Sequence, residues 1–149
     1  MNESDFSEKI KEFKEIMMLN GLNTSGCSDT QIIALENKYG KLPVNYKIFL
    51  SLLGNEAGDF KKGTDLLFKD LDDINDCTLE LMKENNINPP GDLFSFLLHQ
   101  GYSCLFFVTR NDNDPEVYCY TEGDKIKKTG YTFSEYILTE IELYIQHHM

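Results

Sequence analysis

The spacing of apolar residues changes once along this chain, at Asn88-Pro89-Pro90-Gly91, and that change constrains the fold more than any other feature. Before it, apolar side chains recur every three or four residues, which is typical of amphipathic helices. After it, they form short runs or alternate, which is typical of strands separated by turns. A helical period returns at the end. The sequence therefore predicts an α+β fold, with helices packed around a twisted antiparallel or mixed sheet.

The first part of the chain predicts four helices: Asp5–Leu19, a helix from Ser28 to Gly40, Val44–Leu53 and Asp70–Asn85. The second begins with a capping box, Ser28-Asp29-Thr30-Gln31, in which the Ser hydroxyl accepts a free backbone N–H and the Gln reaches back. The third follows Leu42-Pro43, because proline is tolerated in a first helical turn. Its spacing places Leu42, Tyr46, Phe49 and Leu50 in the core.

The remaining segments predict short strands at Leu66–Phe68, Leu93–Leu98, Cys104–Thr109, Glu116–Thr121 and Lys125–Lys128. The strands on either side of the turn at 110–115 should pair as an antiparallel hairpin. A second capping box, Thr132 with Glu135, opens the final helix.

Length favours a single domain spanning 1–149, because 149 residues bury enough surface for one core. No apolar run reaches the length of a membrane span, and the polar N-terminus does not resemble a secretory signal, so we expect a cytoplasmic protein. The four cysteines match no zinc or disulfide pattern and are expected to be reduced core residues.

The charge balance excludes two classes of partner. The net charge is −11, from 25 acidic and 14 basic residues. A nucleic-acid-binding protein needs a basic surface, and anionic lipid repels an acidic one, so we expect neither partner. An acidic chain attracts a basic protein.

Chemical motifs give little support for catalysis. Asp112, Asp114 and Glu116 alternate as in a calcium loop, but Val117 and Gly123 occupy the positions that require Gly and Glu, so we interpret the segment as a turn. No phosphate-binding, zinc-protease or nucleophile motif is present. We expect no cofactor, no metal and no enzymatic activity. We interpret His99 as a hydrogen-bonded histidine at the end of a strand. The alternative is that the protein is a small hydrolase in which His99 acts with a nearby carboxylate.

Four segments resemble, in order, the SUKH superfamily, which includes the SMI/KNR-type regulator of the yeast cell wall. They are ALENKYGKLPVNYKIFLSLLGNEAG at 34–58, HQGYSCLFF at 99–107, DNDPEVYCY at 112–120 and FSEYILTEI at 133–141. The loop Gly54-Asn55-Glu56-Ala57-Gly58 departs from the compact Asn-Gly-Gly turn frequent in the family. The resemblance implies helices packed on a twisted sheet and no catalysis. In bacteria it implies an immunity protein that binds and neutralises a toxin, often a nuclease; fungal relatives are regulatory scaffolds.

Acidic residues are concentrated between Glu56 and Glu84, a segment with nine acidic residues and four lysines. Charge runs are most often a solvated helix face, and the alternative is a docking surface for a basic, nuclease-like toxin. The residues expected to contact that partner are Glu56, Asp59, Phe60, Asp70, Asp72, Asp73, Asp76, Asp112, Asp114 and Glu116. Among these Phe60 is a candidate apolar anchor, as is Phe68, although Phe68 is better explained by core packing.

Overall fold

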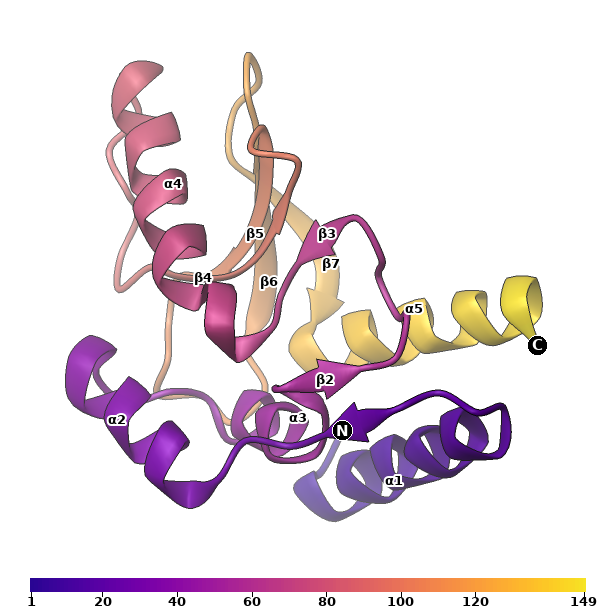
Figure 1. The fold of residues 1–149 in the computed structure, drawn as a ribbon. Helices are drawn as coiled ribbons and strands as arrows, with labels where there is room; N and C mark the ends of the chain where they lie inside the picture. Colours follow the sequence, from indigo (N-terminus) through magenta and orange to yellow (C-terminus); the bar gives the residue numbers. More distant parts are fainter.

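The computed structural model describes residues 1–149, and its α+β architecture confirms the predicted fold class (Figure 1). The helices are α1 (Glu3–Leu19), α2 (Asp29–Tyr39), α3 (Val44–Leu53), α4 (Leu71–Glu84) and α5 (Phe133–His148), with a 3₁₀ turn η1 (Phe68–Asp70) before α4. The strands are β1 (Thr24–Ser25), β2 (Glu56–Ala57), β3 (Thr64–Asp65), β4 (Phe94–His99), β5 (Ser103–Phe107), β6 (Glu116–Thr121) and β7 (Lys127–Thr132). None of these helices combines the length and the apolar character needed to cross a membrane.

The main sheet is an open antiparallel meander in the order β3-β4-β5-β6-β7, and β1 and β2 form a separate two-stranded ribbon. The predicted hairpin is confirmed, since Cys104 of β5 lies opposite Tyr120 of β6. The outer strands differ: β3 has two residues, whereas β7 has six and a free outer edge.

Both predicted capping boxes are present, at Ser28 with Gln31 and at Thr132 with Glu135. The predicted strand at Leu66–Phe68 is wrong. The backbone N–H of Phe68 donates to the carbonyl of Gly54 at 2.8 Å, which turns the chain into η1, so only Thr64 and Asp65 pair with β4. β7 also begins two residues later than predicted and continues to Thr132.

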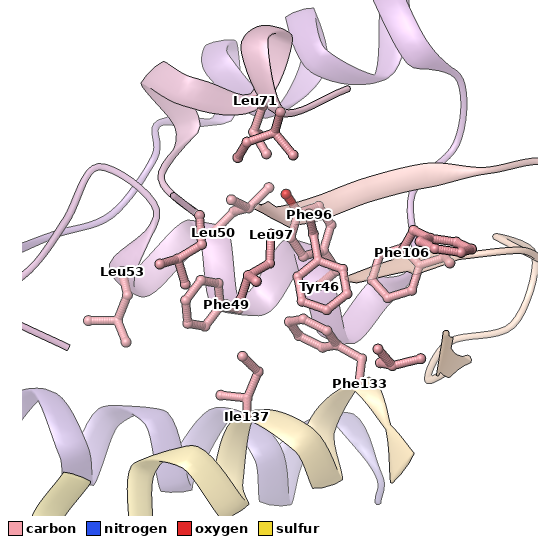
Figure 2. Packing of buried hydrophobic residues seen from close by; sticks show 14 of the residues in the cluster. Tyr46, Phe49, Leu50, Leu53, Leu71, Phe96, Leu97, Phe106, Phe133 and Ile137 are labelled. Atoms are coloured by element: carbon pink, nitrogen blue, oxygen red, sulfur yellow. The ribbon is translucent and has the colours of Figure 1, made fainter. Parts of the chain in front are cut away.

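One face of the sheet carries an aromatic core, built by α3 and α5 against β4 and β5 (Figure 2). The ring centroid of Tyr46 lies 6.0 Å from that of Phe96 and 5.4 Å from that of Phe133. Phe49 is 1% exposed and also packs against Phe133. The predicted core positions of α3 and the adjacent Leu42 are all buried. The SUKH-like segment at 34–58 thus includes the helix that forms the centre of this core.

The other face of the sheet is covered by α4, and here the contact is partly polar. The Asn75 side chain donates to the backbone carbonyl of Ser95 at 2.9 Å and accepts from the Ser95 N–H at 2.8 Å. Thr78 Oγ1 donates to Ser95 Oγ at 2.9 Å. We call these three side chains the α4 latch. It supplies hydrogen-bond partners to the backbone N–H and carbonyl of Ser95, at a part of β4 that the short β3 does not reach.

Candidate protein-interaction surface

Four acidic residues gather at the N-terminal end of α4, and we call them the α4 acidic face: Asp70, Asp72, Asp73 and Asp76. The helix buries its opposite side, where Leu71, Ile74, Thr78, Leu81 and Met82 pack inward as the sequence predicts. Asp72, Asp73 and Asp76 are therefore exposed.

The orientation of this face is fixed by directional contacts. Apolar packing alone would allow α4 to shift along the sheet, because burial is insensitive to direction. The α4 latch removes that freedom, since the Asn75 amide pairs with both backbone groups of Ser95. The acids on the outer side are thereby held in a defined position before any partner arrives.

The carboxylates of the face differ in their surroundings. Asp72 accepts a hydrogen bond from the Lys38 ammonium at 2.8 Å and another from the Tyr39 hydroxyl, and these bonds lower its pKa. The pKa of Asp70 is instead raised, first by partial burial and then by the negative charges of Asp65 and Asp73, which outweigh Lys69. Lys69 therefore does not fully offset burial and the negative charges around Asp70.

The chain's one arginine holds α2 beside this face. Arg110 is 9% exposed; its guanidinium donates to the carbonyl of Tyr39 and forms a 2.6 Å ion pair with Asp92. Fixing the end of α2 places Lys38 and Tyr39 within reach of Asp72. No local pattern connects Arg110 with α2, because Arg110 and Tyr39 lie 71 residues apart in the chain.

The other expected contact residues lie elsewhere. Glu56 is exposed on β2, which pairs with β1. Asp59 faces α5 and accepts a hydrogen bond from the Tyr144 hydroxyl. Burial, and then this hydrogen bond, raise the pKa of Tyr144 to about 12. Neither residue belongs to α4, and their contacts are with β1 and α5, so their contact with a partner stays a prediction.

The turn at 112–116 helps to hold the start of α5 in place. Asp114 accepts hydrogen bonds from the backbone N–H of Ser134 at 2.8 Å and from its hydroxyl at 2.6 Å. Burial raises the pKa of Asp114, but these bonds outweigh it and the net pKa is lowered. Asp114 therefore anchors the start of α5, and its side chain is only 12% exposed. Asp112 is exposed and accepts from the Asp114 N–H, while Glu116 begins β6.

Phe60 corrects another expectation, because it is a core residue and not a surface anchor. Its side chain is 5% exposed and packs against the rings of Phe13 and Tyr144, with centroids 5.4 and 6.0 Å away. Its neighbours in the sequence are mostly polar, so no local pattern indicates that Phe60 is buried. The α1 and α5 helices that bury it lie far away along the chain. Phe68 is half-buried against the core.

His99 ends β4, and its Nδ1 lies 2.9 Å from the hydroxyl of Thr64 on β3. This contact confirms the interpretation of a hydrogen-bonded histidine at a strand end. The only ring contact of His99 is with Tyr102, at 5.6 Å between centroids. All four cysteines are free, and burial raises the pKa of Cys27 and of Cys104 to about 11, which makes both thiols poor nucleophiles.

One functional residue that the sequence reasoning missed is Asn75. It occupies the apolar side of α4, four residues after Leu71 and three before Thr78. An amide at a position of an apolar stripe is a signal, since a buried polar side chain must find hydrogen-bond partners. The identity of its partner, Ser95, required the tertiary structure.

Comparison with known families gives one match. The model of the SMI1 / KNR4 family (SUKH-1) matches residues 26–139, which extend from the end of β1 into α5 and include the aromatic core and the α4 acidic face. α1 lies outside the matched region. No match is found among curated proteins.

Proposed function

Because the chain belongs to the SMI1 / KNR4 family (SUKH-1), which comprises immunity and regulatory proteins, we propose that it is a toxin-neutralising immunity protein. It acts in the cytoplasm without a cofactor and without catalysis. Its partner is a basic, nuclease-like toxin domain, which binds at the α4 acidic face.

The observation that carries the proposal is the cluster of carboxylates at the start of α4, in which the exposed Asp73 and Asp76 have no salt-bridge partner. A nuclease must be locally basic to hold its own substrate, and an acidic surface can occupy that site. The acids at the rim of such an interface mainly raise the association rate, while the fixed position of α4 limits the ordering cost of binding.

A first experiment tests the function itself. The toxic C-terminal domain of a polymorphic toxin encoded beside this gene is expressed in a host with and without the chain. Survival only in the presence of the chain, together with a stable complex of the two proteins, supports an immunity function. A neighbouring gene product that is harmless, or toxicity that the chain does not relieve, contradicts it and favours a regulatory scaffold.

A second experiment tests the surface. Asp73 and Asp76 are exposed and have no salt-bridge partner, so the double variant Asp73→Lys, Asp76→Lys should leave the fold intact. We expect slower association with the toxin and a weaker salt dependence of the rate. The matched control is Glu15→Lys, Glu122→Lys, two exposed acids that also lack a salt-bridge partner, and it changes the net charge equally. Equal rates for the two double variants would place the interface elsewhere.

A further inference from the structure

The strongest unassigned feature is an apolar groove between α1 and α5. The two helices run parallel: Phe6 packs on Phe133 near their starts, and Asn20 contacts Met149 where they end. Figure 1 shows this pair on the side of the molecule away from α4. Between them lies a hollow of about 400 Å³.

The floor of the groove is apolar along its length. Phe13 and Ile141 form its buried base, and Ile16, Leu138 and Ile145 line it with half-buried side chains. Ile145 follows Leu138 by seven residues, so the two lie on one side of α5. A seven-residue spacing of apolar side chains is typical of a helix that packs against a second helix.

The apolar surface continues beyond the hollow at the end of α1. Leu19 follows Ile16 by three residues and is 87% exposed, and Met18 beside it is 66% exposed. At the other end the groove reaches Tyr131 on β7, the outer strand with the free edge. A helix rises about 1.5 Å per residue, so the lining from Glu135 to Ile145 on α5 gives a groove of roughly 15 Å.

The charges on the rim define the partner. Two exposed carboxylates, Glu12 and Glu142, stand along the groove beside the ammonium of Lys9. The other charged groups of the lining have partners of their own, since the Glu135 carboxylate accepts from the Thr132 N–H and the N-terminal ammonium of Met1 pairs with Asp114. A second copy of this chain would bring the same carboxylates against these, which is unfavourable. A helix with an apolar face and basic flanks would match both the floor and the rim.

We propose that the α1–α5 groove is a second docking site, which takes an amphipathic helix of a partner protein with apolar residues toward the floor and lysine or arginine on its flanks. The site is separate from the α4 acidic face and does not depend on the toxin-binding function. The family match covers residues 26–139, so α1 and the part of α5 that carries Ile141, Glu142 and Ile145 lie outside the matched region.

The test uses synthetic peptides and no toxin. A labelled amphipathic peptide with leucine on one face and lysine on its flanks is titrated with the full chain, beside the same peptide with glutamate on its flanks. Fluorescence anisotropy should show binding of the lysine peptide and at least about tenfold weaker binding of the glutamate peptide. Absence of binding at millimolar protein, or equal binding of both peptides, overturns the proposal.

Two variants locate the site. Leu138→Glu should weaken binding of the lysine peptide at least about tenfold, whereas Leu79→Glu, on the exposed side of α4, should leave it unchanged. The double variant Glu12→Lys, Glu142→Lys changes two exposed residues, keeps the apolar floor and should reverse the peptide preference, which serves as the second test if Leu138→Glu fails to fold. Equal effects of Leu138→Glu and Leu79→Glu, or an unreversed preference, contradict the proposal. So does a dimer of the unmodified chain in sedimentation that Leu138→Glu dissolves, since the occupant would then be a second copy.

Discussion

The two faces of the main sheet are held by different forces. On the α3–α5 face, Tyr46, Phe96 and Phe133 interlock as aromatic rings with centroids 5.2 to 6.0 Å apart. On the α4 face, the latch of Asn75, Thr78 and Ser95 places hydrogen bonds inside an otherwise apolar contact. Apolar burial supplies most of the free energy of folding but little direction, whereas a hydrogen bond adds little net energy but fixes geometry. Most of the stability therefore comes from the α3–α5 face, whereas the position of the acidic surface comes from the α4 face.

The largest effect should follow truncation on the aromatic face. Phe49→Ala removes a fully buried ring that packs against Phe133, and we expect it to lower the free energy of unfolding by about 3–5 kcal/mol. Urea unfolding measures the loss. The control is Leu79→Ala on the exposed side of α4, where the loss should stay below about 1 kcal/mol. Equal stability of Phe49→Ala and the parent would contradict the assignment of Phe49 to the core.

A smaller effect should follow loss of the latch. Asn75→Leu leaves the buried N–H and carbonyl of Ser95 without the amide that now pairs with them, which should cost about 1–3 kcal/mol. Asn85→Leu is the matched control, because the Asn85 amide donates only to the carbonyl of Leu81 one turn earlier in α4. Hydrogen exchange at Ser95 should accelerate in the first variant and not in the second. Unchanged exchange in both would show that apolar packing alone positions α4.

A change of opposite sign is expected for one hydroxyl. The Tyr46 hydroxyl is buried in the aromatic core and has no hydrogen-bond partner among the protein groups (Figure 2). Tyr46→Phe removes the desolvated oxygen and keeps the ring, so we expect unchanged stability or a gain of up to about 1 kcal/mol. A thermal melt measures the shift. A clear loss would mean that the aromatic face, like the α4 face, depends on a polar contact.

The smallest effects distinguish two carboxylates within the α4 acidic face. The raised pKa of Asp70 means that the folded state binds its proton more tightly than the unfolded state, so this carboxylate lowers stability at neutral pH. The lowered pKa of Asp72 means the opposite: its stabilisation is present at neutral pH and is lost as the pH falls through its folded-state pKa. Asp70→Asn should therefore raise stability and Asp72→Asn lower it, each by roughly a few tenths of a kcal/mol.

The measurement is urea unfolding of both variants at neutral pH and near pH 3. The difference for Asp70→Asn should shrink strongly in acid, because the raised pKa of Asp70 leaves it mostly protonated near pH 3. The difference for Asp72→Asn should shrink less, because the lowered pKa of Asp72 keeps part of it ionised at that pH. Differences of the same sign for the two variants at neutral pH would contradict the assignment of Asp70 as the repelled member and Asp72 as the paired one.

Local patterns in the sequence determined the elements of this protein. Capping boxes at Ser28 and Thr132, the apolar period of α4 and the alternation of β6 each involve residues only a few positions apart, so their physics is contained in the sequence. The same holds for Tyr46 and Phe49 as core residues, and for the resemblance that the family match confirms. The predictions failed where a distant partner decided the outcome, as at Phe68, whose backbone bond to Gly54 ended β3.

The tertiary structure alone decided which charges share a surface. Asp59, Asp72 and Asp114 look equivalent in the sequence, but one faces Tyr144 on α5, one faces Lys38 on α2, and one anchors Ser134. Phe60 became core for the same reason, because α1 and α5 cover it from opposite ends of the chain. The physical reason is that local propensity depends on neighbours a few residues apart, whereas exposure and charge pairing depend on contacts that only the folded chain creates.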